Sequence, residues 1–364
     1  MAARKRPSPK RVVYLWGAGA TQGEAQNLGA NVSLLMRDTE AFGEGVTTRI
    51  LKRAGSIVSA RFRTGSSGDI EKLISLLGGS GIPEHLELAE KMRTHYFDEL
   101  RTSLAAAKVL NNPQLAIRLL EMHNDHKFEE EVESLSGIIS TNHDGLLQIA
   151  FQVVFGEVNL GLSFVSEEFA PPIYSSTPPL LQLHGSFTWQ FGVPIQVTTL
   201  HKGSKYSSDT VWIPPTTQKE SKQYPFNKLS ALAYELLAER CDVLRVVGAS
   251  LTQNDWNVLC LIFNAQRHRE YVKGTAFRIE LIMPQEAGER IADECAYLKH
   301  LTPIGYLTEG RFADYKDQLV PPESDLANPF SYWLSEKWDF HESRNEFDGK
   351  DARGMSSTLA GETI

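Results

Sequence analysis

The chain has 364 residues, of which 41% are hydrophobic and 23% are charged. This is the composition of a folded globular protein, and the length suits one large or two ordinary domains, so a chain disordered throughout is excluded. The formal net charge of -8 disfavours general nucleic-acid binding through overall charge.

Cysteine usage and hydropathy bear on the cellular compartment. The three cysteines, at positions 241, 260 and 295, lie far apart with no CxxC pair. This spacing disfavours both a disulfide framework and a four-cysteine zinc site. The sequence has no uninterrupted apolar run of transmembrane length. We therefore expect a cytoplasmic protein that has no metal site and does not associate with membranes.

The first predicted strand separates a basic tail from a glycine-rich loop. Residues 1–11 are basic, and we expect them to form a solvated tail. Residues 12–16 (VVYLW) are typical of a buried strand, and GAGATQG follows at 17–23. Glycines there would let the backbone approach a pyrophosphate, although such turns also arise for packing. The loop departs from GxGxxG because Gly23 comes one position late.

Residues 31–135 separate the first two predicted strands and have helical patterns. This stretch is far longer than a simple crossover needs, so we expect an inserted helical subdomain. Its longest predicted helix lies within 83–111. The apolar residues of that helix suit either an interface between copies of the chain or an ordinary core-facing side. They are Leu86, Leu88, Met92, Tyr96 and Leu100.

The second predicted strand, residues 137–140, runs directly into the polar segment TNHD at 141–144. Polar groups at the end of a buried strand must find partners, and a cluster of them is costly to bury. Thr141, Asn142 or Asp144 could cap the helix that follows. Alternatively, the cluster faces a ligand.

The third predicted strand, residues 180–184, ends on His184. A histidine at this place is either a core residue bonded to a backbone carbonyl or an acid–base group, since imidazole titrates near neutral pH. Residues 187–224 are rich in Pro, Thr, Ser and Lys and lack clear periodicity, which predicts an irregular insertion. Trp189 and Trp212, in or near that arm, could stack on a base or simply pack.

Residues 242–248 and 277–283 are the last two predicted strands, and helical patterns precede and separate them. The first of the two runs into GASLTQND, where Gly248 and Ser250 could meet a phosphate or a ribose. Asp255 in the same loop could cap the next helix. Residues 341–364 are Gly-, Ser- and charge-rich, and we expect a mobile tail.

Strands that alternate with helices predict an α/β protein with a Rossmann-like parallel sheet and helices on both faces. Ligands of such sheets bind at the carboxyl ends of the strands. The glycine-rich loop, TNHD, the turn at His184 and the loop at Gly248 all follow predicted strands. We expect these four loops to converge on one crevice.

In order and approximate spacing, GAGA (17–20), TNHD (141–144), HGS (184–186) and GASL (248–251) resemble the loops of the sirtuin superfamily. The resemblance implies that residues 12–340 form a sirtuin-like domain with NAD as its substrate. It also implies roles for individual residues. The expected cofactor-binding residues are Gly17, Ala18, Gly19, Ala20, Thr21, Gly248 and Ser250. The expected catalytic residues are Asn142, Asp144 and His184.

The chain departs from the deacylating sirtuins because it lacks the CxxC pairs of their zinc module, and Thr141 and His143 replace a Gln and an Ile. It is more similar to the zinc-less sirtuin-like proteins of bacterial antiphage defence, which destroy NAD. This implies an NAD hydrolase that forms a homo-oligomer and acts with a HerA-type ATPase or another sensor partner. An NAD-dependent protein deacylase and a non-catalytic NAD or ADP-ribose sensor or scaffold are the alternatives.

Overall fold

A six-stranded sheet is the centre of the computed structural model, in the order β3-β2-β1-β7-β8-β9, and every neighbouring pair of strands is parallel. The structure describes residues 9–30, 70–124, 133–162, 176–191, 196–197, 206–207, 209–214, 222–251, 253–303 and 334. The strands are β1 (Lys10–Trp16), β2 (Glu133–Ser140), β3 (Leu180–Gln182), β7 (Val243–Val247), β8 (Arg278–Ile282) and β9 (Leu301–Pro303).

The apolar runs became strands because a parallel sheet buries both of its faces. The five side chains from Val12 to Trp16 are almost completely buried, and their strand, β1, lies between β2 and β7. All five predicted strands are confirmed. The sixth, β9, was not predicted, because its sequence, LTP, contains no run of apolar residues.

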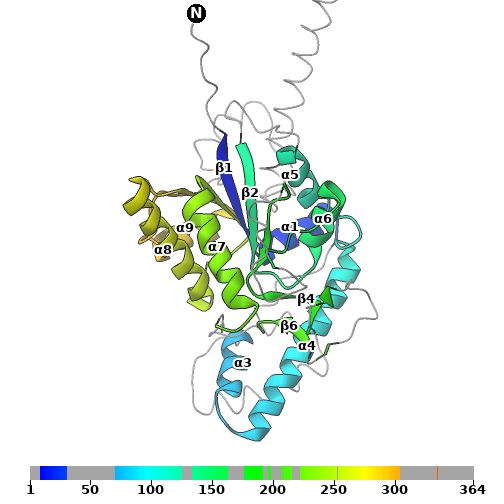
Figure 1. Cartoon of the computed structure of the whole chain (residues 1–364). Coiled ribbons are helices and arrows are strands. Elements are labelled where there is room, and N and C mark those ends of the chain that lie inside the picture. Colours follow the sequence, from blue (N-terminus) through cyan, green and yellow to red (C-terminus); the bar gives the residue numbers. More distant parts are fainter. Residues whose placement is uncertain are drawn as a thin grey trace, which may run out of the picture.

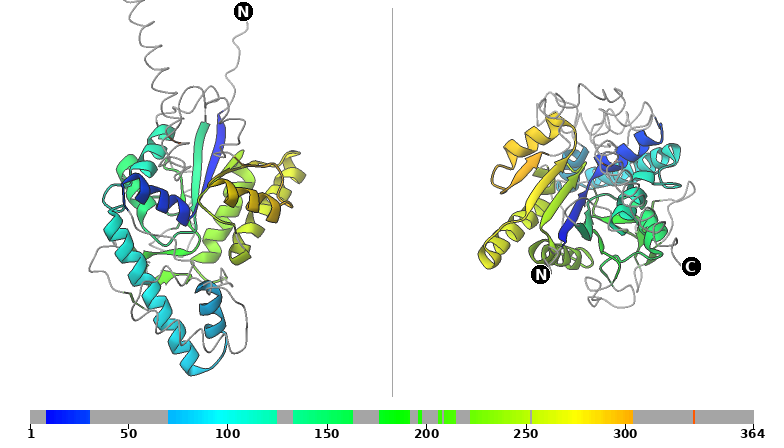
Figure 2. Two further views of the ribbon diagram at one scale, coloured as in Figure 1. Left: turned by 180° about the vertical axis from the view of Figure 1, so that it is seen from behind. Right: turned by 90° about the horizontal axis from the view of Figure 1, so that it is seen from above.

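Helices cover both faces of the sheet, as expected for an α/β fold of Rossmann-like type (Figures 1 and 2). On one face, α7 packs against β1, β2 and β3 and also against α8. On the other face lie α1, α5 and α6, with α5 in contact with both of the others. The bounds are α1 (Ala18–Asn27), α5 (Gln114–Asn124), α6 (Leu146–Phe155), α7 (Phe226–Arg240), α8 (Trp256–Lys273) and α9 (Gln285–Glu294). A short 3-10 helix, η3 (Gln253–Asp255), precedes α8.

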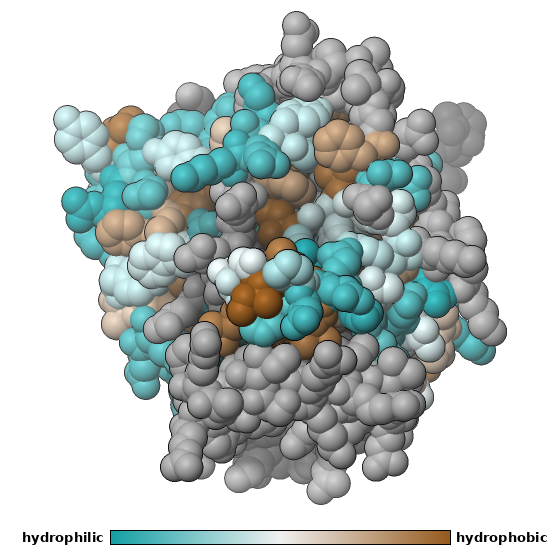
Figure 3. All heavy atoms as spheres, turned by 90° about the horizontal axis from the view of Figure 1, so that it is seen from below, coloured by the Kyte–Doolittle hydropathy of each residue, from teal (hydrophilic) through white to brown (hydrophobic). Residues whose placement is uncertain are grey.

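Two further helices, α3 (Ile70–Gly78) and α4 (Pro83–Ala107), form a hairpin that projects below the sheet in Figure 1. They belong to the expected helical insertion, of which 31–69 and 125–132 lie outside the described residues. On α4, Leu88, Met92 and Leu100 are buried, whereas Leu86 is 44% exposed. Figure 3, seen from below, shows hydrophobic residues among hydrophilic ones on this side of the molecule. The apolar side of α4 therefore mainly serves the core.

The segment expected to be irregular carries strands where it is described. Three strands, β4 (Gly185–Gln190), β5 (Gln196–Val197) and β6 (Thr210–Trp212), form an antiparallel sheet in the order β5-β4-β6. Trp189 and Trp212 are buried in this part of the core, so packing explains both residues. In the sequence, β4 alternates polar and apolar residues (SFTWQ, 186–190), which is typical of a strand, whereas β5 and β6 are too short to show an alternation.

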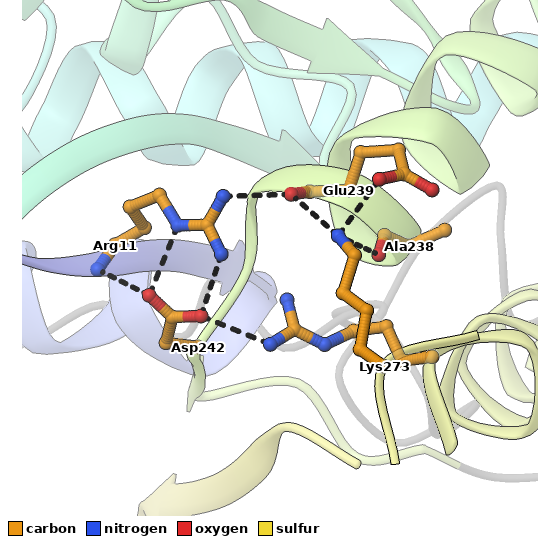
Figure 4. A network of polar contacts seen from close by, with 6 residues as sticks. Arg11, Ala238, Glu239, Asp242 and Lys273 are labelled. Carbon is orange, nitrogen blue, oxygen red and sulfur yellow. Dashed lines mark hydrogen bonds and ion pairs between the residues drawn. The ribbon is translucent and has the colours of Figure 1, made fainter. Parts of the chain in front are cut away.

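The chain enters the sheet at Lys10, two residues earlier than expected. The reason is that Arg11 forms hydrogen bonds with Asp242, the residue directly before β7. The Arg11 side chain donates to both carboxylate oxygens of Asp242, at 3.0 and 2.7 Å. Its Nη1 also donates to the carbonyl of Glu239, at 2.7 Å, and Lys273 pairs with the Glu239 carboxylate (Figure 4). Lys10 and Arg11 thus belong to β1, not to a tail.

The tail expected at 341–364 lies outside the described residues. In the described ranges, we find no helix that combines the length and the apolar character needed to cross a membrane.

Candidate active site at the carboxyl ends of the strands

The structure brings the four polar loops together at one edge of the sheet. The amide of Thr141 donates to the carbonyl of Trp16 at 3.1 Å, which joins the ends of β1 and β2. The amide of Gly17 donates to Val247 at 3.0 Å, which joins the ends of β1 and β7. Leu183, just after β3, donates to Ser140 at 2.9 Å. The loops therefore begin side by side.

The glycines of the first loop allow it to touch the loop after β7. Gly19 donates to the carbonyl of Gly248 at 2.9 Å, and Gly248 has a φ of 60°. A Cβ atom on Gly248 would lie 2.1 Å from the amide nitrogen of Ala20, and one on Gly17 would lie 2.4 Å from the Cα of Ala249. The close approach of the two loop backbones is therefore sufficient to explain why glycine is needed at these positions.

The accessible part of the first loop is small. Ala18 is exposed, Gly19 is half-buried, and Ala20 and Thr21 are buried. Ala18 is the first residue of α1, so this exposed point is the amino end of a helix. On the opposite loop, Ser250 is half-buried. These two positions are where the paired loops could meet an anion or a sugar.

Thr21, Asn142 and Asp144 form one buried polar cluster, called here the threonine cluster. The Thr21 hydroxyl donates to Oδ2 of Asp144 at 3.0 Å, and Nδ2 of Asn142 donates to the Thr21 oxygen at 2.9 Å. An ionised carboxylate only accepts, so the single Thr21 proton is committed to Asp144. The Thr21 oxygen must then accept from the amide. This fixes the Asn142 side chain so that Oδ1 is the end turned away from Thr21.

Asp144 caps the following helix, which is one of the two roles that the sequence left open, and it also bonds to Thr21. Its Oδ1 accepts from the amide of Leu146, the first residue of α6, at 3.0 Å, while its Oδ2 holds Thr21. Burial raises the pKa of the Asp144 carboxyl above its ordinary value, although the bonds from Leu146, Thr21 and Asn142 favour the charged form. Asp144 therefore supports both the helix start and the threonine cluster.

His184 lies in the turn between β3 and β4, almost fully buried. Its Nδ1 lies 3.0 Å from the carbonyl of Thr141. Because a carbonyl oxygen only accepts, Nδ1 must carry a proton, and the neutral ring has its basic lone pair on Nε2. Gly185 follows with a φ of 70°, and a Cβ there would lie 2.3 Å from the carbonyl oxygen of Val211. The turn that orients His184 therefore needs glycine.

His143, between the two cluster residues of its loop, packs in an aromatic group that the sequence did not reveal. Its Nε2 lies 2.9 Å from the carbonyl of Ile213, and its ring stacks on Phe187 at 5.4 Å. The rings of Trp212 and of Tyr96, from α4, lie nearly perpendicular to the His143 ring, with centroid distances of 5.1 and 6.0 Å. The helical hairpin thus contacts the TNHD loop. Because these aromatic residues are far apart in the chain, no local sequence pattern predicts that they pack together.

In the described part of the chain, the structure has no group of three His, Cys, Asp or Glu side chains placed to hold a metal ion. Cys241 and Cys295 are buried as free thiols, and Cys260 is half-buried.

A scan against protein-family models and a search of the curated proteins found no match for this chain. The similarity to the sirtuin superfamily therefore stays a prediction from four short loops, and the geometry of the site has to carry the functional argument.

Proposed function

We propose that this protein hydrolyses NAD to nicotinamide and ADP-ribose. One observation carries the proposal: the threonine cluster lies beside the His184 turn, where β1, β2 and β3 end. Ligands of open parallel sheets bind at this edge. An oriented amide and an imidazole there are suited to a ribose hydroxyl and to the proton that hydrolysis releases.

The reaction breaks the bond between the ribose carbon and the nicotinamide nitrogen, and the electron pair leaves with nicotinamide. The ribose carbon gains positive charge, as in glycoside hydrolysis generally. Water then bonds to that carbon and loses a proton. The site must therefore hold the ribose hydroxyls, place a water and take up one proton.

The geometry supports a division of these tasks. Asn142 Oδ1 would accept from a ribose hydroxyl or from the water, because Thr21 holds the other end of the amide. His184 Nε2 would take the proton, because Nδ1 faces the Thr141 carbonyl. Such a base typically contributes on the order of 10²–10⁴-fold to the rate. Asp144 would act mainly through Thr21, whose hydroxyl it orients, and not by direct contact with the substrate.

The pyrophosphate has a suitable neighbour in the amino end of α1. Exposed amides at a helix start, together with the helix dipole, favour anionic oxygens. Ala18 is exposed there, and Ser250 lies on the paired loop. The amides of Gly17 and Gly19 already donate to Val247 and Gly248, so they would contribute less than the sequence suggested.

The test is NAD turnover by the purified protein, with nicotinamide and ADP-ribose quantified, in the presence and absence of an acylated peptide. We expect hydrolysis without the peptide. Asn142→Ala should lower turnover on the order of 10²-fold and leave the circular dichroism unchanged. Asn27→Ala, an exposed change on α1, is the matched control and should behave like the parent.

The other outcomes identify the competing functions. Turnover only with the acylated peptide, accompanied by its deacylation, would favour a deacylase. Binding of NAD or ADP-ribose without turnover would favour a sensor or scaffold. Either result would reject the proposal.

A further inference from the structure

Four buried polar side chains connect the two halves of the candidate site, and we call them the polar chain: Ser186, Thr188, Gln148 and Gln182. The Ser186 and Thr188 hydroxyls lie 2.9 Å apart, and Thr188 donates to Gln148 Oε1 at 3.0 Å. Gln148 Nε2 donates to Gln182 Oε1 at 2.6 Å. Gln182 Nε2 donates to the backbone carbonyl of Asp144 at 3.2 Å.

The last acceptor fixes the direction of the whole polar chain. The Asp144 carbonyl can only accept, so Gln182 must turn Nε2 toward it and Oε1 toward Gln148. Gln148 must then present Nε2 to Gln182 and Oε1 to Thr188. The single Thr188 proton is therefore used on Gln148. Every donor from Thr188 onward points toward Asp144.

Ser186 has one hydroxyl proton and two neighbouring acceptors, the Thr188 hydroxyl and the His143 carbonyl. Its oxygen also lies 3.1 Å from the carbonyl of His143, but that carbonyl accepts from the amide of Phe187 at 2.9 Å as well. Ser186 can thus donate to Thr188 without leaving the carbonyl unsatisfied. Bonds that all point the same way polarise one another, and at this burial each missing member is costly.

The polar chain joins the segments that carry the proposed catalytic residues. Gln182 and Ser186 lie on either side of His184, on β3 and β4. The other end holds the peptide of Asp144, two residues after Asn142. The two segments also touch directly, because a Cβ atom on Gly145 would lie 2.9 Å from Cγ2 of Thr188. The polar chain therefore links the segments of His184 and Asn142 in addition to their direct backbone contacts.

We propose that the polar chain positions His184 relative to Asn142 and Asp144, an inference that rests on the proposed NAD hydrolysis. Its members are positioning residues, since they act through the backbone of the two loops. A misplacement of about 1 Å between reacting groups can cost on the order of 10²-fold in rate. Loss of the polar chain should therefore lower kcat more than it lowers NAD affinity.

The experiment compares Thr188→Val, which keeps the volume but removes the hydroxyl, with Thr188→Ser, which keeps the hydroxyl. Gln148→Leu is compared with Gln152→Leu, an exposed change on the same helix. We expect Thr188→Val and Gln148→Leu to lower kcat by about tenfold or more. NAD affinity, measured by calorimetry, should change little, and both control variants should match the parent.

Amide hydrogen exchange supplies a readout that does not need NAD cleavage. Exchange in residues 141–146 should quicken in Thr188→Val and Gln148→Leu but not in the controls. If the parent does not cleave NAD, the proposed function fails, and unchanged exchange in residues 141–146 separately overturns the positioning role.

Two kinetic results would also overturn it. One is a kcat like that of the parent in both test variants. The other is a parallel loss of kcat, NAD affinity and near-ultraviolet circular dichroism, which would mean a purely structural role. Should either test variant fail to fold, the other and Gln182→Met decide by the same criteria.

Discussion

A single proton on Thr21 sets the orientation of Asn142. The sequence suggested that Thr21 touches the ligand, but its side chain is completely buried between Asn142 and Asp144. Its hydroxyl is the group that can both donate to the carboxylate and accept from the amide at that place. In the proposed reaction, Thr21 would therefore act through Asn142 and would not touch the substrate itself.

Replacing Thr21 with Val should remove this control. The buried Asp144 oxygen would lose a donor, which costs about 1–3 kcal/mol of unfolding free energy, and the Asn142 amide could turn over. We expect NAD turnover to fall on the order of tenfold or more, while Thr21→Ser keeps most of it. Steady-state kinetics and urea melts of both variants check this. A Val variant as active as Thr21→Ser would contradict it.

Among the helices and strands, apolar runs predicted five of the six strands of the parallel sheet, and the rule for parallel sheets predicted that their loops meet. Partners of buried polar side chains could not be predicted. Glu24 on α1 is completely buried, and its carboxylate accepts from the amides of Leu115 and Ala116, at the start of α5. These partners lie about 90 positions away in the chain. No local pattern links a glutamate to so distant a helix.

The contact between α1 and α5 should depend on pH through Glu24. Burial raises the pKa of Glu24 from 4.5 to about 7, although the α5 amides favour the charged form. The folded protein thus keeps a proton that the unfolded chain releases between these values. The contribution of Glu24 to the free energy of unfolding should fall as pH rises from about 4.5 to about 7, by on the order of 3 kcal/mol.

Urea melts of the parent and of Glu24→Gln at several pH values between 4.5 and 8 measure this contribution. The Gln variant should lose the Glu24 part of the pH dependence. Glu87→Gln, on an exposed side of α4, should retain it. Identical pH dependence in the parent and Glu24→Gln would refute the assignment.

In the molecule as a whole, one buried arginine contacts side chains from three other strands of the central sheet. Arg245 on β7 pairs with Glu133 on β2 at 2.7 Å and with Glu280 on β8 at 2.8 Å. It also donates to the hydroxyl of Tyr14 on β1, which in turn lies 3.0 Å from Nε2 of His123 on α5. All three charged side chains are buried. Four strands and a helix thus share one charge network.

Arg245→Met should strongly destabilise the protein, because it removes the cation paired with buried Glu133 and the nearer of the two cations paired with buried Glu280. Breaking such a buried pair typically costs about 3–5 kcal/mol. Lys91→Met is the control, since the Lys91–Glu87 pair on α4 is exposed and such pairs are worth about 0–1 kcal/mol. Chemical denaturation of both variants gives the comparison. A loss for Arg245→Met no larger than for Lys91→Met would contradict the role of the network.

The position of β1 between β2 and β7 also has a consequence for synthesis of the protein. Val12 pairs with Leu135 on one side and with Val243 on the other. At roughly 5–20 residues per second, the ribosome completes β7 between about ten and fifty seconds after β1. Throughout that interval, β1 lacks one of the two strands between which it lies in the folded sheet. The hydrogen bond from Gly19 to Gly248 also cannot form until Gly248 has been synthesised. A nascent chain that stops before Gly248 therefore cannot assemble the four loops.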